Sequence, residues 1–222
     1  SNGYLADLAA LSDATRRTGA WRVVDAIQGV GQVPLDLGRT QVDVLACGGQ
    51  KWLLSPWGSG FVYVRRELIT RLSPPVTGWM AFEGTDDFTR LTSYHDTLRG
   101  DARRFELITL PYQEFAGMNA SLELVHALGA HRIASHLRTL HAPVLDWADR
   151  TGVRVSSPRG VRGTGILCLA PPEVDRAFRA LKAARIICSL REGAIRLSPH
   201  AYNTVAEMER VVEVLDGECV RA

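Results

Sequence analysis

Lysine is the residue that this sequence lacks most clearly. The chain has 222 residues and 26 basic side chains, yet only Lys51 and Lys182 are lysines, so arginine carries almost all of the positive charge. Cysteine is scarce as well: the four cysteines lie far apart without a CxxC pair. This argues against a disulfide scaffold or a zinc site and favours a reducing compartment. No apolar run approaches transmembrane length and no signal peptide is visible, so we expect a cytoplasmic protein.

A strong net charge is also missing. The formal net charge is +2, and the arginine pairs are scattered along the chain rather than clustered. We therefore expect neither nucleic acid nor an anionic membrane as a partner. The hydrophobic content of 46% is enough to bury the core of one large domain or two small ones.

Three short apolar runs organise the first third of the chain. The run Trp21–Val24 ends at Asp25, the run Val42–Cys47 is soon followed by Lys51, and a third run covers Phe61–Val64. Short Val-rich runs bounded by glycine predict buried strands, and the linker between the first two is long enough for a crossover. Asp25 and Lys51 would then lie at the carboxyl ends of neighbouring parallel strands, where open α/β sheets bind ligands.

The side chains of Lys51 and Asp25 predict a cofactor. An amine that can lose its proton forms Schiff bases, whereas an arginine cannot. A carboxylate one strand away would keep a pyridine nitrogen protonated and make the ring an electron sink, which is what pyridoxal 5'-phosphate (PLP) requires of a protein. We expect Lys51 to be the catalytic Schiff-base lysine and Asp25 the partner of the pyridine nitrogen. The alternatives are a strand-end lysine in solvent and an aspartate that caps a turn.

Four sequence segments resemble the class V aminotransferase family of fold-type I PLP enzymes, which includes cysteine desulfurases, kynureninases and isopenicillin N epimerase-like proteins. They are VVDAIQGVGQVPLDL, GGQKWLLSPWGSGFVYV, RRFELIT and REGAIRLSPHAYNTVAEMERVVEVL, and they follow the family's order over nearly the whole chain. The resemblance implies an α/β fold and a homodimer. Residues 1–110 would be the later part of a PLP-binding large domain with a mostly parallel sheet. Residues 111–150 would be interdomain helices, and residues 151–222 a small C-terminal α/β domain. Because the chain begins in what looks like mid-domain sequence, we expect a fragment of a longer protein.

The same resemblance implies further cofactor contacts. The amide of Gln28 would donate to the phenolic oxygen of PLP; otherwise Gln28 is a turn residue in water. The family usually has Ser-x-His before the lysine, whereas this chain has Gly48-Gly49-Gln50; Gln50 can still donate an amide hydrogen bond. Thr109 matches a threonine that reaches the phosphate across the dimer interface. Trp79 matches a tryptophan that approaches the phosphate in kynureninase-like members, and its alternative is a buried aromatic residue.

The resemblance also implies a substrate contact. Arg196 matches the arginine that binds the α-carboxylate of the amino-acid substrate, a role suited to its planar fork of donors. Its alternative is an ordinary surface arginine, and Arg191 is a weaker candidate. Cysteine desulfurases carry a nucleophilic cysteine in a loop between these two arginines. Here no such loop or cysteine exists, since Cys188 precedes Arg191, so desulfurase activity is disfavoured.

We therefore predict a PLP-dependent enzyme that acts on an amino acid, by transamination or a related reaction at the α-carbon. A kynureninase-like hydrolase or an epimerase-like member is the nearest alternative. A non-catalytic remnant that has lost cofactor binding remains a further one.

Three other segments carry weaker signals. Histidines recur every five residues from His126 to His141, a spacing that rotates them around a helix and predicts solvent-side residues rather than a metal site. Residues 76–103 are polar and rich in turns, which is typical of a functional or mobile segment. Thr204 followed by Glu207 predicts a capping box at the start of the last helix.

Overall fold

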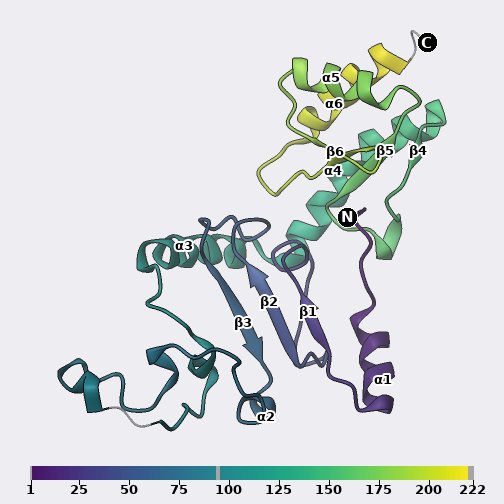
Figure 1. Cartoon of the computed structure of the whole chain (residues 1–222). Helices are drawn as coiled ribbons and strands as arrows, with labels where there is room; N and C mark the ends of the chain where they lie inside the picture. Colours follow the sequence, from purple (N-terminus) through teal and green to yellow (C-terminus); the bar gives the residue numbers. More distant parts are fainter. Residues whose placement is uncertain (1, 94–95, 220–222) are drawn as a thin grey trace. The chain divides into compact units, whose positions relative to one another are not determined.

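The computed structural model describes residues 2–93 and 96–219, which fall into two compact units (Figure 1). Residues 8–30 and 35–125 form one unit, called the sheet unit below. Residues 2–7, 31–34 and 126–219 form the other, called the C-terminal unit. Both units combine helices with a sheet, so the predicted α/β fold is confirmed.

The sheet unit is built on the three predicted strands, β1 (Val23–Asp25), β2 (Val44–Gly48) and β3 (Gly60–Val64), in the order β1-β2-β3. β1 and β2 are parallel, with Asp25 opposite Ala46. β3 runs antiparallel to β2, with Gly60 opposite Gly48. The connection between β2 and β3 is too short for a helical crossover, which explains the antiparallel pairing. Among the described residues, the sheet thus has one parallel and one antiparallel pairing.

The outer strands differ from the prediction of buried strands. On β2, Leu45 and Cys47 are buried, but Val23 on β1 is 69% exposed and Val62 on β3 is 56% exposed. In the part of the chain that the structure describes, β1 and β3 each pair with a neighbour on one side only. The prediction of burial is therefore wrong for the outer strands, because burial of a strand depends on elements packed beside it.

Short helices and one long helix complete the sheet unit. The α-helices are α1 (Leu8–Thr18), α2 (Arg66–Ile69) and α3 (Tyr112–Leu128), of which the last three residues belong to the C-terminal unit. The 3-10 helices are η1 (Trp79–Ala81), η2 (Phe88–Ser93) and η3 (Ala102–Phe105). Val64, Leu68 and Ile69 form a small core against which Phe105 packs. Figure 1 shows α3 beside the edge of the sheet where β2 ends.

The C-terminal unit contains a four-stranded antiparallel sheet. Its strands are β4 (Arg154–Val155), β5 (Leu167–Ala170), β6 (Ser189–Arg191) and β7 (Ala194–Leu197), in the order β4-β5-β7-β6. Its helices are α4 (Ala130–Thr151), α5 (Val174–Ala183), α6 (Val205–Cys219) and the 3-10 helix η4 (Gly160–Arg162). Leu140, Trp147, Leu169, Ile195 and Leu215 are fully buried between these elements.

Three separate stretches of sequence meet in the C-terminal unit. The backbone N–H of Leu5 donates to the carbonyl of Arg162 at 2.8 Å, and the side chain of Arg162 pairs with Asp7 at 2.8 Å. Gln32, which lies between β1 and β2 in the sequence, accepts a hydrogen bond of 2.6 Å from the N–H of Gly165. The connection between the parallel strands therefore runs through the C-terminal unit, and no helix is assigned along it.

The histidines of α3 and α4 follow the prediction with one exception. His126 and His131 are exposed, and His136 is half-buried and contacts the carbonyl of Asn203 at 2.9 Å. His141 is only 6% exposed, so the prediction of a solvent-side residue is wrong there. Burial lowers the pKa of His141 from 6.5 to about 4, against a smaller opposing effect of a hydrogen bond with the backbone of Gly165. The described residues contain no cluster of side chains that could hold a metal ion.

Candidate active site

The ends of the two parallel strands bring together the polar residues predicted for the cofactor. Asp25 is the last residue of β1 and Lys51 lies three residues beyond β2. Because β1 and β2 are parallel neighbours, both residues lie at the same edge of the sheet. Both side chains are exposed.

The carboxylate of Asp25 is oriented by the turn that follows β1. The N–H of Ile27 donates to Oδ1 of Asp25 at 3.0 Å, while the N–H of Ala26 continues the ladder to the carbonyl of Ala46 at 2.8 Å. The thiol of Cys47 on β2 has its pKa raised, first by burial and second by the negative charge of Asp25. The charge of Asp25 therefore acts across to the strand that leads to Lys51.

Gln28 and Trp52 join the two loops that leave these strands. Nε1 of Trp52 donates to Oε1 of Gln28 at 3.0 Å. Trp52 is 5% exposed, and Gln28 is half-buried. Trp52, which follows Lys51 in the chain, is thus hydrogen-bonded to Gln28, which lies three residues beyond Asp25.

The turn that carries Lys51 is held by its own backbone. The N–H of Leu54 donates to the carbonyl of Lys51 at 3.1 Å, the N–H of Ser55 to Gly49 at 2.9 Å, and the N–H of Gly49 to Ser59 at 2.9 Å. Leu54 adopts a φ of 56°, which is uncommon for a residue with a side chain. Such backbone conformations persist where the surrounding structure enforces them, and they cluster at functional sites.

Helix α3 supports the second half of this turn. The hydroxyls of Ser55 and Ser121 are 2.7 Å apart and hydrogen-bonded. One helical turn earlier, a Cβ on Gly117 would lie 2.7 Å from Cγ of Pro56, so only glycine allows the turn to pack this closely. Positions four apart share one face of a helix, and this face of α3 positions the lysine turn.

Gly48 and Gln50, which stand where the resemblance implies a serine and a histidine, form a linked pair. A Cβ on Gly48 would lie 2.5 Å from Oε1 of Gln50. The amide of Gln50 therefore occupies the space that a side chain at position 48 would fill. The sequence alone gave no sign that these two differences are connected.

Trp79 and Thr109 lie in segments that pack against each other. A Cβ on Gly78 would lie 1.8 Å from the carbonyl oxygen of Leu107, so the backbones before Trp79 and before Thr109 are in direct contact. Trp79 is half-buried and packs edge-on against Phe88, with ring centroids 5.7 Å apart. Thr109 is exposed. The structure thus brings these two predicted residues together, and no contact between them and Lys51 is found among the described residues.

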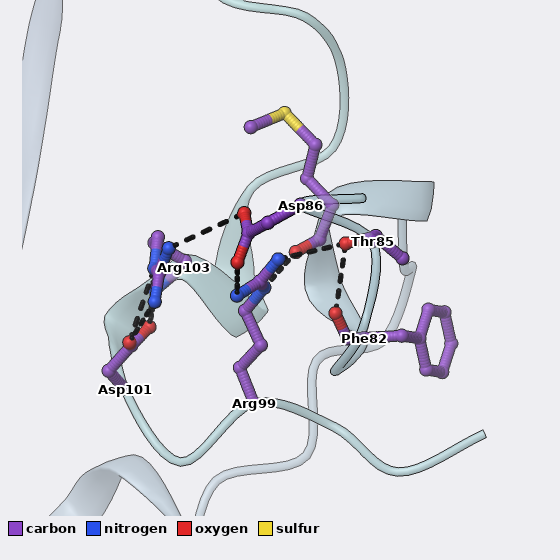
Figure 2. A network of polar contacts seen from close by, with 7 residues as sticks. Phe82, Thr85, Asp86, Arg99, Asp101 and Arg103 are labelled. Atoms are coloured by element: carbon purple, nitrogen blue, oxygen red, sulfur yellow. Dashed lines mark hydrogen bonds and ion pairs between the residues drawn. The ribbon is translucent and has the colours of Figure 1, made fainter. Parts of the chain in front are cut away.

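A buried arginine orders the irregular segment between these two positions (Figure 2). Arg99 is 7% exposed and donates to the carbonyl of Met80 at 2.8 Å, to Oδ2 of Asp86 at 2.8 Å and to Oγ1 of Thr85 at 2.9 Å. Arg103 extends the network, since it contacts Asp86 at 3.7 Å. The pKa of Asp86 is lowered, chiefly by its hydrogen bond with Arg99. Sequence reasoning missed this network, which holds the segment around Trp79 in place.

Arg196 lies on β7 of the C-terminal unit, opposite Cys168 on β5 and Ser189 on β6. Its Nε is buried, and no hydrogen-bond partner is found for that atom among the described residues. Arg196 lines a pocket of about 790 Å³ together with Cys188 and the N-terminal half of α6. Arg191, the weaker candidate, is exposed at the end of β6.

A comparison with known sequence families identifies one family. The family described as "Aminotransferase class-V" matches residues 1–211. The chain belongs to the class V aminotransferase family. Among its relatives is an uncharacterized aminotransferase, YcbU, of Bacillus subtilis, which is 30% identical over 219 residues. That match covers 99% of this chain but 57% of YcbU, so the chain spans little more than half of the length of this relative.

Solved structures of similar fold include a cysteine desulfurase and the enzyme C-DES. The class V chain resembles the apo cysteine desulfurase of Thermococcus onnurineus with a TM-score of 0.87 and 24% identity, covering 99% of this chain and 57% of that one. It also resembles a variant of the enzyme C-DES with glycine covalently linked to its PLP cofactor. There the TM-score is 0.83 and the identity 21%, over 97% of this chain and 57% of that one. At these identities the likeness shows the fold.

The residues at the sheet edge fit PLP by their chemistry. One amine, one carboxylate and two amide side chains come from adjacent loops, and the amine belongs to one of only two lysines in the chain. Oδ1 of Asp25 already accepts the N–H of Ile27, which fixes the direction of the carboxylate. Together these side chains can hold a protonated ring nitrogen, a phenolic oxygen and an aldehyde carbon.

In the part of the chain that the structure describes, no helix is long and apolar enough to span a bilayer.

Proposed function

We propose that this chain supplies the lysine side of a PLP site in an enzyme that acts on an amino acid, by transamination or a related reaction at the α-carbon. The observation that carries the proposal is the parallel pairing of β1 with β2, which places Asp25 and Lys51 at one edge of the sheet. Membership of the class V aminotransferase family supports the same reading.

Four residues at this edge would hold PLP. Lys51 would bind the aldehyde carbon, Asp25 would keep the ring nitrogen protonated, Gln28 would donate to the phenolic oxygen, and Gln50 would donate to the phosphate. PLP, when bound, supplies an electron sink for negative charge at the α-carbon of the substrate. The amine of Lys51 is then the group of this chain that can move a proton at that carbon.

Arg196 would fix the orientation of the substrate. A guanidinium can form two parallel hydrogen bonds with a carboxylate, which holds the amino acid in one position. The Nε of Arg196 is buried without a hydrogen-bond partner among the residues that the structure describes, and this atom and the adjoining pocket of about 790 Å³ support the role. Orientation at the α-carbon decides which of its bonds is broken.

We include a cytoplasmic homodimer in the proposal, with Trp79 and Thr109 as further phosphate contacts. Thr109 would reach the cofactor of the partner chain. Large apolar side chains beside it are exposed, with Ile108 at 71% and Tyr112 at 69%. Exposed apolar residues that lie together are typical of a surface that another chain covers.

Desulfurase chemistry remains disfavoured. Arg191 and Ala194 pair across the turn Glu192-Gly193, in which both residues have positive φ angles of 49° and 69°. A two-residue turn of this type leaves no loop that could carry a nucleophilic cysteine. Burial raises the pKa of the nearby Cys188 thiol, which lowers the fraction of the reactive thiolate.

The two lysines provide an internal control for the main test. The whole gene product that carries this chain should be loaded with PLP, reduced with borohydride and mapped by mass spectrometry. The pyridoxyl mass is expected on the peptide with Lys51; Lys51→Arg should abolish it, whereas Lys182→Arg should not. A label on Lys182 alone, or no label, would reject the assignment and favour a non-catalytic remnant.

The loaded enzyme then separates the reaction types. Transfer of an amino group from an amino acid to a 2-oxo acid supports transamination. Racemisation without transfer would favour the epimerase-like alternative, and hydrolytic cleavage of kynurenine would favour the kynureninase-like one.

A further inference from the structure

The hydrogen bond between Trp52 and Gln28 determines which end of the Gln28 amide lies against Trp52. The indole nitrogen of tryptophan is a donor and never an acceptor. The atom that lies 3.0 Å from Nε1 of Trp52 must therefore be the carbonyl oxygen of Gln28. The amide nitrogen, with its two donors, is on the other side of the group.

The position of Trp52 couples this orientation to Lys51. Trp52 follows Lys51 directly in the chain. Its side chain is 5% exposed, so the ring is held in the interior. Gln28 comes from the loop after β1, and Trp52 from the loop after β2. The hydrogen bond is a direct side-chain link between the loop that follows Asp25 and the loop that carries Lys51.

We propose that Trp52 is a positioning residue: its indole N–H turns the Gln28 amide so that the amide nitrogen can donate to the phenolic oxygen of PLP. This inference rests on the proposed function, because it assigns a role within the same site. Loss of the indole N–H would remove the contact that holds the carbonyl oxygen of Gln28, an acceptor, against Trp52 and away from the electron-rich phenolic oxygen.

The role has a spectroscopic consequence. A hydrogen bond donated to an oxygen stabilises the form of that oxygen with more negative charge. The visible absorption band of the PLP-loaded protein titrates with the proton that the phenolic oxygen shares. Loss of the donor should therefore raise the pH at which the band titrates, by about one pH unit for a typical hydrogen bond.

The test compares tryptophans from the same turn. Trp52→Phe keeps a buried ring and removes only the N–H, while Trp57→Phe alters a side chain that is 80% exposed. In the loaded gene product, Trp52→Phe should raise the titration midpoint of the band and keep the borohydride label on Lys51. Gln28→Ala should cause the same rise, and combining both changes should add nothing. Trp57→Phe should leave the midpoint unchanged.

The proposal is overturned if Trp52→Phe leaves the midpoint unchanged while Gln28→Ala raises it, or if the two effects add. Equal shifts from Trp57→Phe would also overturn it. A wild-type protein without a visible band or a label on Lys51 would reject the proposed function and the orienting role with it.

A measurement without PLP distinguishes failure of the orienting role from failure of the proposed function. It uses no Trp52 variant, so it does not depend on whether such a variant folds. In the cofactor-free protein, the indole N–H of Trp52 should exchange with deuterium at least tenfold faster in Gln28→Met than in the wild type. Faster exchange would show that the link exists whatever the protein binds. Equal exchange rates would overturn the inference even if PLP binds to Lys51.

Discussion

Acidification should destabilise the C-terminal unit through one buried side chain, His141. Burial lowers the pKa of this histidine from 6.5 to about 4, because charging the imidazole in the interior is unfavourable. The unfolded chain therefore binds a proton more readily than the folded one. The stability that the neutral ring contributes is complete above pH 6.5 and is lost as the pH falls to about 4. At 1.36 kcal/mol per pH unit, this loss is up to roughly 3 kcal/mol of the free energy of unfolding.

The measurement is urea unfolding, followed by circular dichroism, at several pH values between 7.5 and 4. His141→Gln removes the titrating group and keeps a side chain that can donate to the backbone near Gly165. This variant should lose less stability with acidification than the wild type, while His131→Gln, at an exposed position of the same helix, should follow the wild type. Parallel curves for the wild type and His141→Gln would refute the reasoning.

Three further predictions concern the sheet unit and the substrate contact. Gly49→Ala should cost about 1–3 kcal/mol of the free energy of unfolding, because its Cβ would lie 2.7 Å from Cβ of Ser55. Gly48→Ala should cost much less, since the atoms nearest to its Cβ are the ends of the flexible side chains of Gln50 and Ile27; equal losses in chemical denaturation would contradict this. Arg99→Met should make the segment around Trp79 more sensitive to limited proteolysis than Arg103→Met does, because Arg99 is the buried member of the network. Similar cleavage rates would show that the network does not order the segment. Arg196→Ala should weaken amino-acid binding by roughly 2–5 kcal/mol without loss of PLP, and loss of PLP at unchanged substrate affinity would disprove its role.

The sequence was sufficient where the signal is local. The Val-rich runs predicted all three strands of the sheet unit, and the parallel pairing that places Asp25 beside the lysine loop follows from their spacing. The capping box is confirmed by reciprocal hydrogen bonds: the N–H of Thr204 donates to Glu207 at 2.7 Å, and the N–H of Glu207 donates to Oγ1 of Thr204 at 3.3 Å. Such contacts depend on residues three positions apart, which a sequence displays directly.

Contacts between distant residues could not be predicted in this way. Arginine is typical of the surface, so nothing in the sequence distinguished the buried Arg99 from its neighbours. Trp52 and Gln28 are 24 residues apart, and their hydrogen bond depends on the pairing of two strands. For His141, the spacing correctly predicted that the histidines point in different directions around the helix. Which of these directions is buried depends on the loop at Gly165, more than 20 residues further along the chain.

The path of the chain between β1 and β2 has a consequence for synthesis on the ribosome. Gln32 is 1% exposed, and its hydrogen-bond partner Gly165 emerges 133 residues later. The sequence separation between Leu5 and its partner Arg162 is larger still. Long separations slow folding, because the ends of a long loop must meet before any contact repays the entropy of closure. The C-terminal unit therefore cannot be completed until residues 162–165 have emerged, whereas all residues of the sheet unit emerge before them. Chaperones would meet the nascent chain before these contacts have formed.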